Sequence, residues 1–187
     1  MKPEQVFDDQ PVLEGQGLTL RPLAPDDRHA LSDAASDPKI WAGHPSTDRY
    51  KPEVFKLYMD MLLDRGGTLV IRETTTSRVI GCSRYYASPD RPGKIAIGFT
   101  FLTTDHWGGA TNFTLKRLML DHAFRSFDEV WFDIAPTNIR SQKATAKLGA
   151  VEIYRATLDL SGAALPWVCL CLTRDAWQAT VATRVGT

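Results

Sequence analysis

The sequence predicts a mixed α/β (α+β) fold, with a mostly antiparallel central sheet of about seven strands and helices on both faces. Two observations lead to this prediction. Strand-like segments follow one another over residues 68–102, separated by hairpin-like breaks. A long amphipathic segment at 112–127 then leads into another strand-like segment at 129–135, and this succession indicates a right-handed parallel crossover. We expect residues 1–187 to form one domain, with its core over 16–173, because a chain of this length can bury a core.

The first predicted elements follow a polar lead-in over residues 1–14. Apolar and polar residues alternate at 18–23, as they do in a half-buried strand. Pro25 and the two acids after it suit the first turn of a helix, and this helix ends before Pro38. A second helix is expected over 52–64, where apolar side chains recur every three or four residues before two glycines.

Three strands are then expected in a row, at 68–73, 78–86 and 94–102. The third alternates from Ile95 to Phe101, so that its apolar side chains share one face. Hairpin connections between these strands make the first part of the sheet antiparallel.

The second half of the chain begins with the longest predicted helix, at 112–127. A strand at 129–135 follows, and then a short helix that ends at Gly149, a position typical of a left-handed helix cap. The last two strands are expected at 151–158 and 166–173. Exposed strand edges near 166–172 suggest pairing across a homodimer.

Composition excludes several classes of function. Twenty-two basic and twenty-two acidic residues give no net charge, which argues against a broad nucleic-acid surface. No apolar run approaches the ~20 residues of a membrane-spanning helix, and the N-terminus lacks the apolar core of a signal peptide. Three cysteines favour a reducing cytoplasm, and no cluster of His and Cys predicts a metal site. Neither a GxSxG nor an HExxH motif supports a hydrolase.

The loop at 103–111 is the strongest functional signal, because it joins a strand to the start of a helix. Backbone N–H groups and the helix dipole at such a junction favour a phosphate or pyrophosphate. Gly108 and Gly109 allow close approach of a ligand to the backbone, and Asn112 can cap the helix or donate to the ligand. The alternative is a turn whose glycines only reverse the chain.

The second signal lies at 136–141, where a strand end enters a helix. Asn138 suits the helix N-cap and Ser141 the third helical position. Capping with no further role is the alternative for Asn138, although this junction also lies at the edge of a sheet where ligands bind.

Together these segments resemble the GNAT superfamily of acyl-CoA-dependent N-acyltransferases, and most of all its ribosomal-protein-alanine acetyltransferase branch. The resemblance covers roughly residues 16–173. It is carried by the strand at 18–23, by Ile97-Gly98-Phe99 followed by His106-Trp107-Gly108 and a helix, and by Thr137-Asn138-Ile139-Arg140-Ser141 running to Lys147-Leu148-Gly149-Ala150.

The resemblance implies that acetyl-CoA binds in a V-shaped split between the fourth and fifth strands, at 94–102 and 129–135, without a metal. The implied cofactor-binding residues lie on the fourth strand, in the next loop and at the following helix: Phe101, Leu102, Thr103, Trp107, Gly108, Gly109, Ala110, Thr111, Asn112, Asn138 and Ser141. An amine attacks the thioester directly, a fourth-strand amide polarises its carbonyl, and Ser141 or Tyr154 protonates the departing thiolate.

The sequence departs from the family pattern at two places. Ala110 stands where the loop usually has glycine, which is tolerable if its φ is negative. Ala96 stands where many members of this branch carry a glutamate that serves as the base. Asp133, on the fifth strand, is a substitute candidate, although an acid that faces solvent or pairs with an arginine is the alternative.

A missing base bears on the choice of acceptor. An α-amine with a pKa near 8 is about a tenth neutral at pH 7, whereas a lysine amine near 10.4 is neutral about once in a few thousand. We therefore expect a low-pKa amine as the substrate.

The acceptor site of this family borders the loop between the first two helices, which makes Trp41, His44, Asp48 and Arg49 candidates for contact with substrate. Packing is an equal alternative for Trp41, and a solvated loop is the alternative for the other three. Tyr85 is a further candidate, although Tyr85 and Tyr86 point to opposite faces of their strand and one of them belongs to the core.

These expectations describe a cytoplasmic N-acetyltransferase that acts on a primary amine, either a protein N-terminus or a small molecule. Nucleic acid and membrane are not expected partners. The alternative is a non-catalytic acyl-CoA-binding domain that keeps the fold without turnover.

Overall fold

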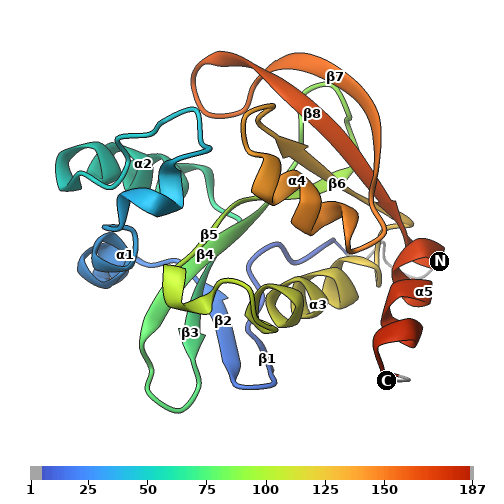
Figure 1. The fold of residues 1–187 in the computed structure, drawn as a ribbon, viewed down its shortest axis with the longest axis horizontal. Coiled ribbons are helices and arrows are strands. Elements are labelled where there is room, and N and C mark those ends of the chain that lie inside the picture. The colour runs from blue at the N-terminus through green and yellow to red at the C-terminus, as the bar shows by residue number, and fades with distance from the viewer. Residues whose placement is uncertain (1–5, 186–187) are drawn as a thin grey trace.

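One open sheet of eight strands runs through the protein, for which a computed structural model describes residues 6–185 (Figure 1). The strand order is β1-β2-β3-β4-β5-β6-β8-β7, and only the pairing of β5 with β6 is parallel. The strands are β1 Leu13–Gly15, β2 Leu18–Pro22, β3 Thr68–Glu73, β4 Val79–Tyr86, β5 Ile95–Leu102, β6 Glu129–Ile134, β7 Val151–Asp159 and β8 Ala164–Thr173.

The mixed, mostly antiparallel sheet confirms the predicted fold class, with eight strands instead of seven. The additional strand, β1, lies in the segment that was expected to be a loose lead-in, of which residues 1–5 fall outside the described part. It pairs with β2 from Leu13↔Leu20 to Gly15↔Leu18. Three residues are too few for an alternating pattern to predict a strand.

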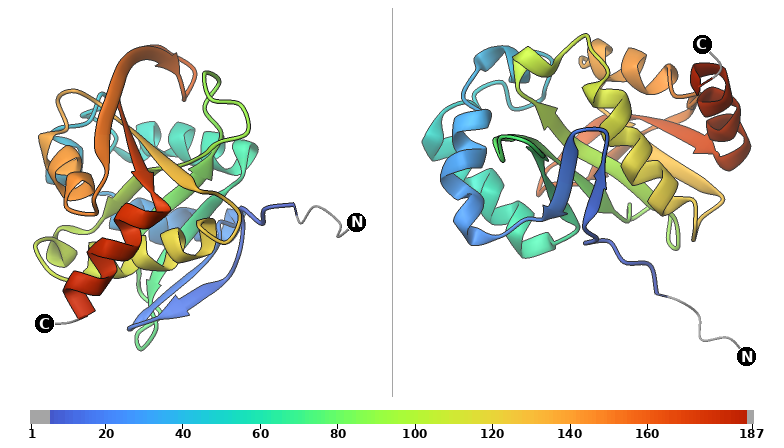
Figure 2. Two further views of the ribbon diagram at one scale, coloured as in Figure 1. Left: turned by 90° about the vertical axis from the view of Figure 1, so that its right-hand side faces the viewer. Right: turned by 90° about the horizontal axis from the view of Figure 1, so that it is seen from below.

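Helices cover both faces of the sheet, with α1 and α2 on one face and α3 and α5 on the other (Figures 1 and 2). The helices are α1 Arg28–Ala34, α2 Pro52–Arg65, α3 Thr111–Ala123, α4 Ile139–Ala146 and α5 Arg174–Val185, with short 3-10 turns at Pro25–Asp27, Pro38–Trp41 and Thr104–His106. None of the helices within residues 6–185 is both long and apolar enough to cross a bilayer.

Helix α5 was not predicted, since the expected core ended at residue 173. Its Trp177 is buried, stacks beside Phe113 at 5.6 Å and donates a hydrogen bond to Asp121 Oδ1 at 2.8 Å. Both partners lie on α3, so α5 extends the core on that face of the sheet.

The parallel pair β5 and β6 comes apart after two residue pairs, Ile95↔Val130 and Ala96↔Trp131. On the other side of β5 the register with β4 shifts between Cys82 and Arg84. Phe99, in this irregular stretch, has a φ of 52°, which is unusual for a bulky side chain. The second half of β5 therefore has a strand on one side only, and its other edge borders an opening.

The predicted dimer edge is wrong, because β8 is an interior strand. It pairs with β6 from Val168 to Thr173 and with β7 from Ala164 to Cys171, so residues 168–171 have neighbours along both edges. The hairpin returns β8 into the gap beside β6, and this leaves β7 and β1 as the outer strands of the sheet.

Candidate active site in the parted sheet

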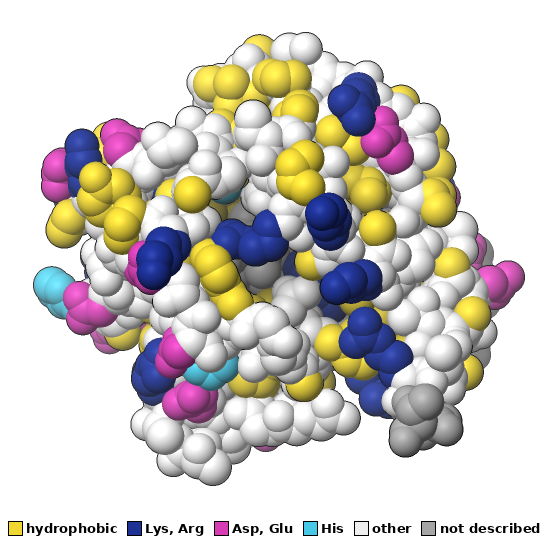
Figure 3. Space-filling view, in the orientation of Figure 1, with side chains coloured by type: hydrophobic (Ala, Val, Ile, Leu, Met, Phe, Trp, Pro, Cys, Tyr) yellow, Lys and Arg dark blue, Asp and Glu magenta, His cyan; other side chains and the backbone are white. Residues whose placement is uncertain are grey.

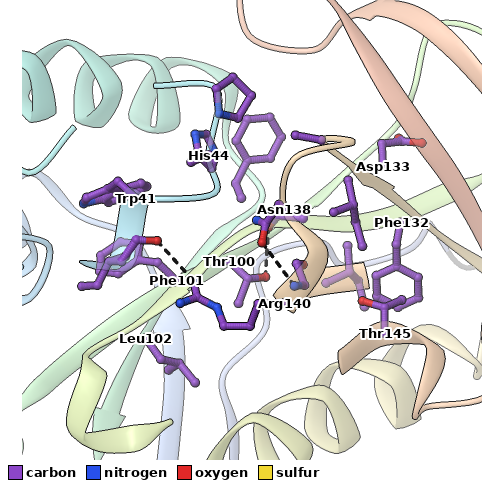
Figure 4. A pocket seen from close by; sticks show the side chains of 18 of the residues that line it. Trp41, His44, Thr100, Phe101, Leu102, Phe132, Asp133, Asn138, Arg140 and Thr145 are labelled. Atoms are coloured by element: carbon purple, nitrogen blue, oxygen red, sulfur yellow. Dashed lines mark hydrogen bonds between the residues drawn. The ribbon is translucent and has the colours of Figure 1, made fainter. Parts of the chain in front are cut away.

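A cleft lies between β5 and β6 where the two strands separate. Its walls come from segments far apart in the sequence. Figure 4 shows Thr100, Phe101 and Leu102 along β5, Trp41 and His44 to one side, and Phe132, Asp133 and Thr145 to the other. Asn138 and Arg140, from the β6–α4 junction, project into the space between them (Figure 4).

The loop before α3 forms the lower end of the cleft and leaves the helix N-terminus free of side-chain caps. Ala110 is the N-cap residue, its φ is −75°, and within residues 6–185 this helix start has no side-chain cap hydrogen bond. Gly108 has a φ of +73°, and a Cβ built at either Gly108 or Gly109 would meet no atom within 4 Å. Packing therefore does not explain these glycines, and the open backbone donors suit a phosphate.

Only part of the predicted loop reaches the cleft. Trp107, Gly108 and Asn112 line it, whereas Gly109, Ala110 and Thr111 lie outside its lining. Thr103 also lies outside, and its hydroxyl contacts His106 Nδ1 at 3.1 Å.

Arg140 lines the cleft beside this loop, although no motif had singled out its side chain. Its guanidinium stacks on the Trp107 ring at 3.7 Å and donates to the backbone oxygen of Ile40 at 3.2 Å. Trp107 is held in turn by a hydrogen bond from Nε1 to the Leu102 oxygen at 3.0 Å. Burial lowers the pKa of Arg140, and no carboxylate within residues 6–185 forms an ion pair with it.

Lys116 is a second cation in the cleft that the sequence did not reveal. It projects from α3, is 6% exposed, and its Nζ donates to Thr100 Oγ1 on β5 at 2.9 Å. The Thr100 hydroxyl also contacts Ser83 at 2.7 Å. Burial without an acidic partner lowers the pKa of Lys116 to about 7. A charged residue inside the apolar stripe of a predicted helix was the one available signal.

The predicted cap at the entrance to α4 is present. Asn138 Oδ1 accepts a hydrogen bond from the Ser141 N–H at 3.2 Å, and both residues line the cleft. The same junction holds the loop after Trp41, since Thr137 Oγ1 donates to the Gly43 oxygen at 3.0 Å. This loop thus bridges the two walls of the parted sheet.

The upper end of the cleft is aromatic. Trp41 is 2% exposed, donates through Nε1 to the Ala35 oxygen, and lies 5.3 Å from the Phe101 ring, so it both packs in the core and lines the cleft. His44 lies edge-on to Trp41 at 5.5 Å. Burial, followed by the charge of Arg49, lowers the pKa of His44 to about 3, which keeps its ring neutral near neutral pH.

Asp133 lies at the back of the upper end, in a fully buried ion pair. Its Oδ2 accepts from Arg91 at 2.5 Å and from the Tyr86 hydroxyl at 2.8 Å. Its other oxygen, Oδ1, is buried and has no hydrogen-bond partner among the described residues. The pairing with an arginine, which was the alternative to a catalytic role, is therefore present. One buried carboxylate oxygen of this cleft-lining residue has no partner among the described residues.

Two tyrosines lie elsewhere than predicted. Tyr85 belongs to the opposite face, where it is 1% exposed and donates to the Met119 oxygen at 2.6 Å; its neighbour Tyr86 lines the cleft instead. Tyr154, on β7, lies outside the lining. Its hydroxyl accepts a hydrogen bond from Arg91 Nη1 at 2.6 Å and donates one to Asp90 Oδ2 at 2.5 Å. The alternation of a strand separates Tyr85 from Tyr86, but it does not say which face the cleft occupies.

Comparison with known proteins identifies the family. The family model of the acetyltransferase (GNAT) domain matches residues 17–151. The chain belongs to this family. Within residues 6–185 there is no group of three or more His, Cys, Asp or Glu that could hold a metal ion. No curated protein sequence matches the chain.

Solved GNAT structures share the fold at low sequence identity. A GCN5-related N-acetyltransferase from Brucella melitensis has 14% identity and a TM-score of 0.76, covering 94% of this chain and 86% of that chain. Mycobacterium smegmatis RimJ, solved in complex with CoA-disulfide, has 18% identity and a TM-score of 0.64, with coverages of 92% and 93%. The ribosomal-protein-S5-alanine acetyltransferase from Vibrio fischeri has 18% identity and a TM-score of 0.62, with coverages of 90% and 99%.

Proposed function

We propose that this GNAT protein transfers an acetyl group from acetyl-CoA to a primary amine, either a small molecule or a protein N-terminus, by direct attack in a ternary complex. The observation that carries the proposal is the separation of β5 from β6 directly above the uncapped N-terminus of α3. A thioester with a long polar arm fits an open strand edge, and its diphosphate fits free helix amides.

The lower end of the cleft would hold acetyl-CoA. The backbone from Trp107 to Asn112 would receive the diphosphate, with Arg140 beside it as a counter-charge. The free edge of β5 from Phe101 to Thr103 would pair with the amides of the pantetheine arm. Asn138 and Ser141 line the same space from α4. The CoA-disulfide in the RimJ complex is a related ligand on the same fold.

The upper end would hold the amine. Asp133 Oδ1, which lacks a partner, would accept a hydrogen bond from the amine and take up its proton as the new bond forms. The nitrogen attacks the thioester carbonyl, the C–N bond forms, and the C–S bond breaks. The departing thiolate takes a proton from the hydroxyl of Ser141, which lines the cleft while Tyr154 does not. Ser141 regains a proton from solvent, and Asp133 releases the proton of the amine to solvent, so that both side chains return to their starting states.

Release of free thiol from acetyl-CoA with a panel of amines tests this proposal. We expect turnover, fastest for low-pKa α-amines and slower for lysine side-chain amines, because Ala96 leaves no strong base. Ser141→Ala should lower kcat by about 10²-fold or more if the hydroxyl supplies the proton. Tyr154→Phe, which removes a hydroxyl outside the cleft, should change kcat by less than about twofold.

Each contrary result would exclude a different part of the proposal. Calorimetric binding of acetyl-CoA without thiol release for any amine would favour the alternative, a non-catalytic acyl-CoA-binding domain. Equal losses in Ser141→Ala and Tyr154→Phe would remove the assigned role of Ser141. Failure to bind acetyl-CoA at all would overturn the whole proposal.

A further inference from the structure

Arg49 lies at the upper end of the cleft in surroundings that do not neutralise its charge. It is 8% exposed and lines the cleft. Its guanidinium stacks on the Tyr58 ring at 3.9 Å and lies 5.2 Å from the Trp41 ring. Its nitrogens bond only to neutral groups, the His44 ring at 3.2 Å and the Ser46 hydroxyl at 3.2 Å.

No carboxylate within the described residues forms an ion pair with Arg49, and the charge of Asp48 acts on it more weakly than burial does. Arg49 forms no ion pair there, and the nearest acid along the chain, Asp48, is exposed. Burial is the main cause that lowers the pKa of Arg49, which indicates a cation that has lost water without gaining a counter-ion. Buried charges are normally paired, so an arginine in this state on the wall of a ligand cleft lacks its partner.

Basic side chains outnumber acidic ones in the whole cleft lining, and not only around Arg49. Asp133 is the acidic residue in the lining, and Arg91 already pairs with it. Arg49 and Arg140 are left over as cations, and Lys116 adds a third positive charge when it is protonated. Basic side chains accordingly gather around the hollow in the middle of the face seen in Figure 3. Arg140 lies at the loop before α3, on the acyl-CoA side, whereas Arg49 belongs to the loop between Trp41 and α2.

We infer that the acceptor is an amine that also carries an acidic group, a carboxylate or a phosphate, and that Arg49 binds this group. The inference rests on the proposed function, because it assigns the substrate class of the same cleft. Arginine presents a planar fork of donors that matches both anions, and the aromatic rings of Tyr58 and Trp41 fix the plane of the fork. The neutral His44 ring contacts the guanidinium at 3.2 Å without adding a second positive charge.

Matched pairs of acceptors test this inference. Glycine, β-alanine and 4-aminobutyrate are each compared with their carboxamides, and glucosamine 6-phosphate with glucosamine. At saturating acetyl-CoA we expect the acidic member of at least one pair to have the higher kcat/KM, by about tenfold or more. A neighbouring carboxylate makes an amine more basic, so intrinsic reactivity favours the amides and cannot produce the expected order. The carboxylate and phosphate arms distinguish the two kinds of acid.

Variants of Arg49 connect the preference to this side chain. Arg49→Gln should reduce the ratio of kcat/KM between acidic and neutral members to about one. Arg49→Lys should keep a smaller preference, because it retains the charge without the fork. Arg125→Gln, an exposed arginine just after α3, is the charge-matched control and should leave the ratio unchanged. A preference for neutral members, or an unchanged ratio in Arg49→Gln, overturns the inference.

Binding of the products separates this inference from the proposed function. Calorimetry compares N-acetylglycine with N-acetylglycinamide, and the two N-acetyl-4-aminobutyrate analogues likewise, on the protein saturated with CoA. We expect the acids to bind more tightly to the wild type and to lose this advantage in Arg49→Gln. This result supports the anion site even if no amine is turned over, whereas equal binding of acid and amide by the wild type contradicts it.

Discussion

Lys116 combines three properties that a surface lysine lacks. It is buried, it has no acidic partner within residues 6–185, and its amine bonds to Thr100 on the strand that borders the opening. The dry cleft favours the neutral amine, and the pKa of about 7 lies well below that of the unfolded chain, near 10.4. The charge of this side chain thus depends on pH within the physiological range.

The lowered pKa makes folding stability depend on pH. Between about pH 7 and 10 the unfolded chain binds a proton at Lys116 that the folded chain does not, so stability rises with pH by up to about 1 kcal/mol per unit. Lys116→Met removes this dependence and should be more stable than the wild type below pH 7, with the difference shrinking toward pH 10. Urea unfolding at several pH values measures it.

Lys147→Met is the matched control, because Lys147 is exposed after α4. Its stability curve should run parallel to that of the wild type. A Lys116→Met curve that also runs parallel would contradict the burial of the ammonium group.

At the scale of elements, the irregular pairing of β4 with β5 shapes the opening. Gly81 on β4 has a φ of +155°, and a Cβ built there would lie 2.0 Å from the Phe101 oxygen on β5. The close approach of the two backbones positions β5 just where its other edge becomes free. Phe99, with its positive φ, lies two residues before Phe101. The strand is therefore fixed by β4 while it has no neighbour on the side of the cleft.

Gly81→Ala should push β5 out of place. We expect a loss of about 2 kcal/mol or more, together with a higher KM for acetyl-CoA, because the added methyl group clashes with backbone atoms. Gly93→Ala is the control, since its φ is +77° but no atom lies within 4 Å of the added Cβ. It should be destabilised by about 1–2 kcal/mol without a change in KM. Thermal unfolding and initial rates measure both effects, and equal KM values for the two variants would refute the assigned role of β5.

For the whole molecule, charge is balanced overall but not in the cleft. The chain carries 22 basic and 22 acidic residues, yet Arg49, Lys116 and Arg140 face the opening without acidic partners among the described residues. A ligand with several negative charges would restore the balance, and the field of the cleft would attract it. Acyl-CoA with its phosphates at one end and an acidic amine at the other would satisfy this arrangement.

The field of the cleft predicts how acetyl-CoA binding responds to Arg140 and to salt. Arg140→Gln should raise the KM for acetyl-CoA roughly tenfold, as expected for the loss of one charged hydrogen bond. Raising the salt concentration from about 0.05 to 0.5 M should raise the KM of the wild type by a larger factor than that of the variant. Salt screens the attraction between Arg140 and the cofactor, and the variant lacks this charge. Arg125→Gln, on the exposed surface, should behave as the wild type. An unchanged KM in Arg140→Gln would remove this residue from the cofactor site.

Local patterns alone predicted much of the architecture. Alternation located β2 and β5, strand-like segments bounded by turn signals located the other strands from β3 to β8, and helical periodicity located α2 and α3. The cap pair Asn138 and Ser141 marked the start of α4. These features depend on residues close in the chain, so the sequence contains them directly. The short strand β1 and the helix α5 were not predicted, because their stability comes from packing against β2 and α3.

Tertiary structure decided which side chains face the cleft. Tyr86 lines the cleft instead of Tyr85, and Tyr154 lies on an outer strand, bonded to Arg91. Asp133 pairs with Arg91. Three basic side chains from different elements meet at one opening: Arg49, Lys116 and Arg140. The sequence by itself determined the order of elements, the cap and the glycine-bearing loop. The charge of the cleft depends on which basic side chains lack acidic partners. The partners of each side chain are set by contacts between residues that are distant in the chain, such as Lys116 with Thr100 and Arg140 with Ile40.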